Sequence, residues 1–236
     1  MDEVEKYMIA EIKEKKEREF YNLYWKHYIA LEHKFLWTDS FVTIEKSNFA
    51  TFSIEYEFLL QTICSEINVV CQCIMKEYAP DFTYKNIADF IKFAKKVNEP
   101  LKYNAIVLEM YDLLLFPWVD VEIDNNGRIT KFPKWWIDNN DIKHNRITRK
   151  IVNGKMSVIE NYKKANLENV LNALAALYNL ETKCINKFRK KYSEIIENQN
   201  IDCDDLAFPE KSIFSLSLQP EERFHLDMQK IKNEMF

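Results

Sequence analysis

Apolar residues recur at helical spacing along most of the chain, and two segments carry the most continuous apolar stripes. The first segment starts at Thr51 or Ser53, either of which can cap a helix, and stops before Pro80. The second starts at Lys164 and contains alanines that let a neighbouring helix approach closely. The stripes are Phe58, Leu59, Ile63, Ile67, Val70 and Ile74 in the first segment, and Leu167, Val170, Leu171, Leu174, Leu177, Tyr178, Ile185 and Phe188 in the second. We predict two long helices that pack against each other, because each apolar face needs a cover.

Weaker helical patterns lie on both sides of this pair. Residues from Asp2 to about Phe35 predict one long helix or two helices in series, and their charged run of mixed sign suits a solvated face. A shorter helix is predicted from Asn86 to Val97, and Pro220 is expected to open a last, charged helix.

Short β elements are predicted at the periphery. Turns at 124–127 and at Asn153-Gly154 are each flanked by short apolar runs, as in hairpins, and alternating residues at 214–218 are typical of an edge strand. The segment 101–118 fits either helix or strand. The fold class is therefore predicted as mainly α, a helical bundle with small peripheral β elements, and we expect residues 1–236 to form a single domain.

Composition narrows the classes of function. With 47% hydrophobic residues the chain can bury a substantial core, but its two glycines, Gly127 and Gly154, leave no room for a glycine-rich nucleotide loop. Neither an export signal nor an apolar run of membrane-spanning length is apparent, which favours a cytoplasmic protein without a membrane partner. The five cysteines lack a metal-knuckle spacing, and Cys64 and Cys71, seven residues apart on an apolar helical pattern, are expected as buried thiols. Nothing in the sequence predicts a metal or another cofactor.

Positive charge is concentrated between Lys131 and Lys155. This segment holds seven Lys or Arg residues and two Asp residues, a balance of about +5 in a chain whose net charge is −4. The cations are Lys131, Lys134, Lys143, Arg146, Arg149, Lys150 and Lys155. A basic patch on an otherwise acidic protein can hold a phosphate backbone, so the sequence allows a nucleic acid such as RNA as a partner.

The patch includes a short helix that Pro133 can start, with His144 near its end. Helical spacing places Asn139, Lys143 and Arg146 on one face. An imidazole beside two cations can move a proton while the cations stabilise an anionic phosphorane. The alternative is structural, with Trp135 and Trp136 packed inward and the cations stabilising an ordinary helix C-terminus.

A family resemblance rests on two motifs. Trp135-Trp136, Asn139/Asn140 and Lys143-His144-x-Arg146 form the first, and Ala165-Asn166-Leu167-x-Asn169-Val170-Leu171-Asn172-Ala173-Leu174 forms the second. They resemble a group of bacterial helical proteins that is in turn similar to the HEPN superfamily, whose helical bundles are common in toxin–antitoxin and phage-defence systems. The resemblance spans roughly residues 53–188, with Ser65-Glu66-Ile67 matching the first core helix.

This resemblance implies a HEPN-like helical bundle and a metal-independent endoribonuclease or RNA-binding component, acting as a homodimer or with a partner protein. His144 fills the histidine of the HEPN pattern, but Asn139 or Asn140 stands where the family has an arginine. Lys143 and Arg146 would then supply the charge during attack of an RNA 2′-hydroxyl on the adjacent phosphate. The implied catalytic set is His144, Arg146, Lys143 and Asn139, with Lys131, Lys134, Arg149 and Lys150 binding RNA. A non-catalytic HEPN-like protein–protein interaction module remains the alternative, because fold does not determine function.

Overall fold

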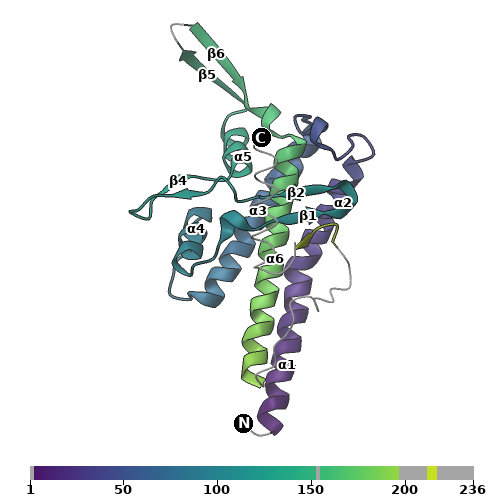
Figure 1. Cartoon of the computed structure of the whole chain (residues 1–236), viewed down its shortest axis with the longest axis vertical. Helices are drawn as coiled ribbons and strands as arrows, with labels where there is room; N and C mark the ends of the chain where they lie inside the picture. The colour runs from purple at the N-terminus through teal and green to yellow at the C-terminus, as the bar shows by residue number, and fades with distance from the viewer. Residues whose placement is uncertain (1–2, 153–154, 197–211, 217–236) are drawn as a thin grey trace.

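The structure is a computed structural model that describes residues 3–152, 155–196 and 212–216, with side chains omitted for 187–196 and a few other positions. It is mainly α-helical with small antiparallel strand pairs at the periphery, as the sequence predicts (Figure 1). The helices are α1 (Glu3–Phe20), α2 (Lys26–Thr38), α3 (Ile54–Tyr78), α4 (Ile87–Lys96), α5 (Lys134–His144) and α6 (Leu167–Ile196).

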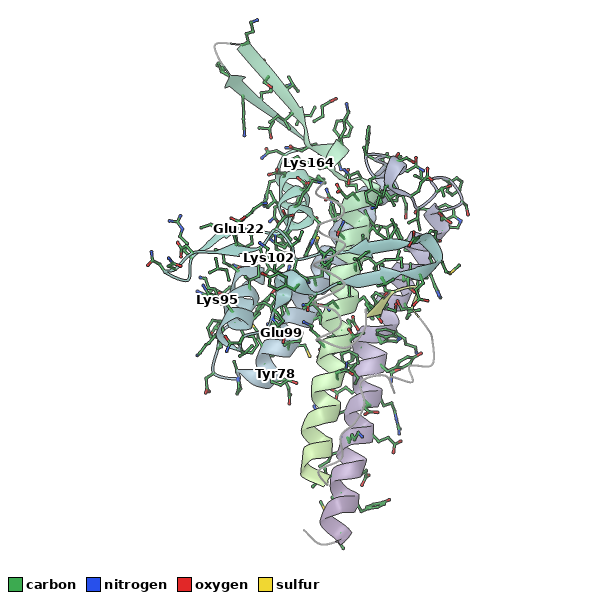
Figure 2. The ribbon with its side chains drawn as sticks, viewed as in Figure 1. Tyr78, Lys95, Glu99, Lys102, Glu122 and Lys164 are labelled. Carbon is green, nitrogen blue, oxygen red and sulfur yellow. The ribbon has the colours of Figure 1, made fainter. Side chains whose placement is uncertain are left out.

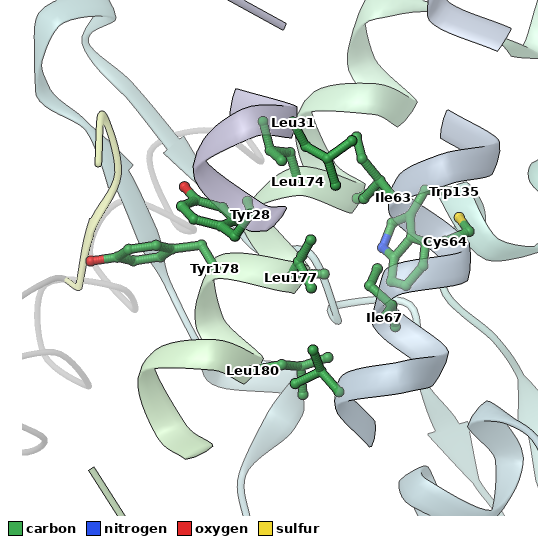
Figure 3. Packing of buried hydrophobic residues seen from close by; sticks show 14 of the residues in the cluster. Tyr28, Leu31, Ile63, Cys64, Ile67, Trp135, Leu174, Leu177, Tyr178 and Leu180 are labelled. Atoms are coloured by element: carbon green, nitrogen blue, oxygen red, sulfur yellow. The ribbon is translucent and has the colours of Figure 1, made fainter. Parts of the chain in front are cut away.

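The core lies where α3 packs along α6, which confirms the predicted pairing (Figure 3). Ser53 caps α3, since its hydroxyl accepts a hydrogen bond from the amide of Tyr56 at 3.0 Å. Ile63 and Ile67 of α3 and Leu174 of α6 are fully buried between the two helices. The small side chains of Ala173, Ala175 and Ala176 are buried on α6 as well.

The N-terminal helices are joined in series, one of the two arrangements expected. A single π-helical turn, Tyr21–Trp25, connects α1 to α2, and α1 runs beside the C-terminal half of α6 (Figure 1). In α2, Tyr28 and Phe35 are buried in the core. The apolar residues near the start of α1, among them Val4 and Met8, are exposed, although they recur at helical spacing.

The segment left open between helix and strand forms strands linked by 3-10 turns. Strands β1 (Ile106–Leu108) and β2 (Leu113–Leu115) pair antiparallel, and β7 (Ser215–Leu216) pairs with the other edge of β1. The sheet order is therefore β2-β1-β7. The predicted strand near Phe214 is confirmed over β7, whereas Leu218 and the helix expected after Pro220 lie outside the described residues.

Two further antiparallel strand pairs lie on either side of the predicted turn positions. Strands β3 (Glu122–Ile123) and β4 (Ile129–Lys131) flank a turn in which Gly127 has a φ of +77°, a conformation that favours glycine. Strands β5 (Ile147–Val152) and β6 (Lys155–Glu160) pair over their whole length and project from the helical body (Figure 1). The β5–β6 hairpin continues directly from the end of α5 and leads through the 3-10 turn Asn161–Lys164 to α6.

Within the described ranges, α3 is the one helix with the length and hydropathy of a membrane span, at a mean hydropathy of 1.5. Half of its most apolar window is buried inside the protein, against α6 and the helices around it. A core helix has the same properties, so this feature does not indicate a location.

Candidate nucleic-acid interface

Helix α5 is anchored to the body by tryptophans. Trp135 is buried, and its indole N–H donates to the carbonyl oxygen of Pro117 at 2.6 Å. Its ring also meets Trp118 edge to face, with 5.4 Å between ring centroids, and Trp136 packs at the rim of the core. This tryptophan pair therefore packs as core, which matches the structural alternative for the first motif.

A polar network joins α5 to the start of α6. It gives a structural role to Asn169, one of the residues in the Ala165–Leu174 motif. The side-chain amide of Asn169 donates to the carboxylate of Asp138 and to the backbone carbonyl of Lys164, both at 2.8 Å. The ammonium of Lys164 lies 3.2 Å from Asp138 and 2.5 Å from Asp141 (Figure 2 labels Lys164). Sequence reasoning did not single out Asp138, Lys164 or Asn169 as a unit, because they meet only in the folded chain.

Electrostatics keep this network charged. Burial by itself lowers the pKa of Lys164, but the hydrogen bond to Asp141 and the charge of Asp138 outweigh it and raise that pKa overall. Lys134 adds a contact at 3.0 Å with Glu168 on α6. The network thus fixes α5 on α6, and with it the direction in which the β5–β6 hairpin leaves the body.

The four residues of the implied catalytic set are dispersed. His144 and Lys143 are exposed in the last turn of α5. Asn139, one helical turn before Lys143, is buried, and its side-chain oxygen has no hydrogen-bond partner among the described residues. Arg146 lies beyond the helix and donates to the carboxylate of Glu57 on α3 at 3.0 Å.

The expectation that Asn139, Lys143 and Arg146 share one helical face is therefore wrong. Helix α5 ends at His144, and Asn145 takes an extended conformation with φ of −150° and ψ of 104°. Arg146 consequently follows strand geometry, not helical spacing. Lys143 is left as the neighbouring cation of His144 in the described structure.

The cations of the basic patch fall into two groups. Lys131 forms an ion pair with Asp120 at 2.9 Å, Lys134 pairs with Glu168, and Arg146 pairs with Glu57. No ion pair within the described residues engages Lys143, Arg149, Lys150 or Lys155, all of which are exposed. We call these four residues the cationic hairpin surface, because three of them lie on β5 and β6 and the fourth at the end of α5.

The register of the hairpin places two of its cations on one face and most of its exposed apolar side chains on the other. Lys150 and Lys155 lie on one face, where Lys150 is paired with Ser157. The other face carries Arg149 beside four exposed apolar side chains, of which Ile151 is 78% exposed and Met156 72% exposed. The four are Ile147, Ile151, Met156 and Val158. Sequence reasoning missed this apolar face, although the alternation of residues in both strands could have revealed it.

An aromatic pair lies near the base of the hairpin. The rings of Phe52 and Tyr162 meet edge to face at 5.7 Å, and the ammonium of Lys163 lies 5.8 Å from the Phe52 centroid. Phe52 is 42% exposed. Exposed rings with a nearby cation are the groups that stack on nucleic-acid bases.

Comparisons with known proteins yield no relative of this chain. No protein-family model matches the sequence, and neither the curated proteins nor the solved structures give a significant match.

Proposed function

We propose that this protein binds RNA through the cationic hairpin surface. The observation that carries the proposal is the segregation of charge: ion pairs neutralise the patch cations on the body, whereas the four on the hairpin and the end of α5 stay exposed. Unpaired Lys and Arg side chains release condensed counterions when they contact phosphates, which favours binding. The resemblance to HEPN proteins supports RNA as the nucleic acid and a toxin–antitoxin or phage-defence setting for it.

The shape of the hairpin supports the same proposal. A projecting two-stranded ribbon can lie along a single RNA strand, with cations on the phosphates and apolar tip residues against unstacked bases. Ile151 and Met156 form the second pair from the far end of the ladder, after Val152 and Lys155, so the two apolar side chains lie near the leading end of the ribbon. Phosphate contacts dominate this arrangement, and we expect weak sequence preference.

Cleavage would be a separate step of the same function. In it, the 2′-hydroxyl of RNA would attack the adjacent phosphate while His144 accepts and returns protons. Lys143 would be the cation that stabilises the phosphorane, since Arg146 is engaged by Glu57. Binding does not require this chemistry.

Salt-dependent binding tests the proposal. Affinity of the full chain for a single-stranded RNA is measured by fluorescence anisotropy over a range of salt concentrations. Four phosphate contacts predict a slope of log affinity against log salt of about −3, because each contributes about 0.7. The triple variant Arg149→Gln, Lys150→Gln, Lys155→Gln should reduce the slope to about −0.7. A single-stranded DNA of the same sequence shows whether the 2′-hydroxyl matters.

A matched variant controls for net charge. Lys92→Gln, Lys96→Gln and Lys102→Gln also remove three exposed lysines, from α4 and the 3-10 turn Leu101–Tyr103 (Lys102 is labelled in Figure 2). This control should bind RNA like the unaltered protein. Equal loss of affinity in both triple variants, or no binding by the unaltered protein at low salt, contradicts the proposal.

The apolar face of the hairpin favours a second candidate, self-association as an interaction module. A free-standing hairpin is only marginally stable in water. Burial of its four exposed apolar side chains against a second copy of the chain would stabilise it. Ile151→Ser with Met156→Ser should then convert a dimer to a monomer in analytical ultracentrifugation, with the salt slope of RNA binding retained. A monomer at all concentrations of the unaltered protein excludes this candidate.

A further inference from the structure

Two cysteines meet where α3, α6 and the π-helical turn come together. The thiols of Cys73 on α3 and Cys184 on α6 are hydrogen-bonded to each other, and the hydroxyl of Tyr24 donates to Cys73. Cys184 is buried, whereas Cys73 is partly exposed. A buried thiol, that of Cys184, therefore lies next to a thiol that solvent can reach, that of Cys73.

Cys73 opens onto a groove of about 260 Å³ on the surface of the protein. Lys16, Tyr24 and Lys76 are among the side chains that line it. A small polar molecule can therefore reach Cys73 from solvent, whereas the side chain of Cys184 is buried.

The pKa values of the two thiols are shifted in opposite directions. The hydrogen bond from Cys184 lowers the pKa of Cys73 to about 7, with a further contribution from Tyr24, although burial opposes both. The same hydrogen bond and burial raise the pKa of Cys184. Burial also raises the pKa of Cys64 and that of Cys71. Among the cysteines that the structure describes, Cys73 is thus the one with thiolate character near neutral pH.

The surroundings of the pair differ from an ordinary helix interface in two ways. Glu181, one turn before Cys184 on α6, is fully buried, and neither of its carboxyl oxygens has a hydrogen-bond partner among the described residues. Burial raises the pKa of Glu181, which favours the neutral form of this acid beside the pair. The π-helical turn that places Tyr24 is a rare conformation, and such turns occur frequently at functional sites.

We propose that Cys73 and Cys184 form a redox-active dithiol that is oxidised by hydroperoxides. The Cys73 thiolate attacks one peroxide oxygen, the O–O bond breaks, and the other oxygen leaves as an alkoxide or hydroxide that solvent protonates. Cys73 is now a sulfenic acid. The Cys184 sulfur then attacks the Cys73 sulfur, the S–O bond breaks, and the hydroxyl leaves as water with the proton of Cys184. The dithiol has lost two electrons to the peroxide, and a disulfide links α3 to α6.

Peptide mapping tests the connectivity in the full chain. The reduced protein is treated with hydrogen peroxide, quenched with an alkylating agent under denaturing conditions and analysed by mass spectrometry. We expect a Cys73–Cys184 disulfide, with Cys64 and Cys71 recovered as alkylated thiols. A parallel sample with Cys203→Ser, a cysteine outside the described residues, distinguishes a bridge to that residue. Recovery of Cys73 as a free thiol, or a bridge from Cys73 to any cysteine other than Cys184, overturns the proposal.

Two further measurements test the order of the steps. In Cys184→Ala, the Cys73 sulfenic acid should persist and be captured by dimedone, whereas Cys73→Ala should give neither adduct nor disulfide. In the unaltered protein, the rate of alkylation of Cys73 should rise with a midpoint near pH 7, and removal of the Cys184 donor should move the midpoint upward. The measurement on the unaltered protein does not depend on whether any variant folds. If the midpoint of Cys73 alkylation in the unaltered protein lies at the ordinary thiol pKa, that result alone overturns the proposal.

Discussion

The guanidinium of Arg146 donates to the carboxylate of Glu57 at 3.0 Å, across a separation of 89 residues in the chain. Glu57 is buried at the start of α3, while Arg146 itself is largely exposed just before β5. The contact ties the base of the β5–β6 hairpin to the core helix. Because Arg146 is paired with Glu57, this cation, which lies two residues after His144 in the sequence, is not free to contact RNA.

Arg146→Ala is therefore expected to affect stability more than RNA binding. Loss of the guanidinium leaves the buried Glu57 carboxylate without its ion-pair partner and should cost about 1 kcal/mol of unfolding free energy. The salt slope of RNA binding should stay unchanged, in contrast to Lys150→Gln, which should reduce it by about 0.7. Urea denaturation and anisotropy titrations of the two variants measure both quantities. A reduced slope in Arg146→Ala would show that Arg146 leaves Glu57 to contact phosphate.

His144→Ala separates the catalytic hypothesis from the structural one. The imidazole is exposed at the end of α5, so its removal should change the free energy of unfolding by no more than about 0.5 kcal/mol. If His144 moves protons, RNA cleavage in the presence of a chelator should disappear while RNA binding persists. A melting curve, an RNase assay and an anisotropy titration on the same preparation provide the three readouts.

The matched control for this variant is His33→Ala, which removes another exposed imidazole, from α2. It should leave cleavage, binding and stability unchanged. Cleavage that survives in well-folded His144→Ala protein would end the catalytic hypothesis and leave RNA binding as the function to be tested.

Leu174→Ala measures the packing of the two core helices. Leu174 is fully buried on α6 between α2 and α3 (Figure 3), and its truncation should cost about 2–5 kcal/mol through lost burial and a residual cavity. Val69→Ala, at an exposed position of α3, should cost less than about 1 kcal/mol. Thermal melts of both variants make the comparison. Similar melting temperatures for the two would contradict the burial of Leu174.

The helices could be predicted from the sequence because their signals are local. Apolar spacing and the caps at Ser53 and Asn86 depend on neighbours within one or two turns. Helices α3 and α4 begin and end close to the predicted residues, and α6 begins close to its predicted start. The turn at Gly127 was predictable for the same reason. The segment 101–118 was not, because its strands are only three residues long and are defined by pairing with each other and with β7.

The candidate sites depend on pairs that are distant in the sequence. Spacing along the chain gives no indication that Glu57 engages Arg146, that Asp120 engages Lys131, or that Cys184 meets Cys73. The patch of seven cations was visible in the sequence, but which of them remain without an ion pair depends on where the fold places the carboxylates of Glu57, Asp120 and Glu168. The π-helical turn at Tyr21–Trp25 likewise has no local signal that distinguishes it from α-helix.

The buried carboxyl of Glu181 predicts a stability that falls as pH rises. Burial, and the charges of Glu66 and Cys73 that face it, raise the pKa of Glu181 well above the ordinary carboxyl value of 4.5. Above that value the unfolded chain has released the proton that the folded chain still holds, so the unfolded state binds fewer protons. The free energy of unfolding should then fall by up to about 1.4 kcal/mol for each pH unit above the ordinary value, until the folded pKa is reached.

Glu181→Gln should remove this contribution, because the amide does not titrate. Urea denaturation between about pH 5 and about pH 7 should show a shallower decline for the variant, and a higher stability than the unaltered protein at the upper end. Some decline should remain, since burial also raises the pKa of Glu66 and that of Glu32. The range stays below neutrality because the lowered pKa of Cys73 acts with the opposite sign at higher pH. Glu109→Gln, at an exposed carboxylate, is the control and should keep the slope of the unaltered protein. Parallel pH profiles for Glu181→Gln and the unaltered protein would show that Glu181 is ionised in the folded state and therefore has a partner.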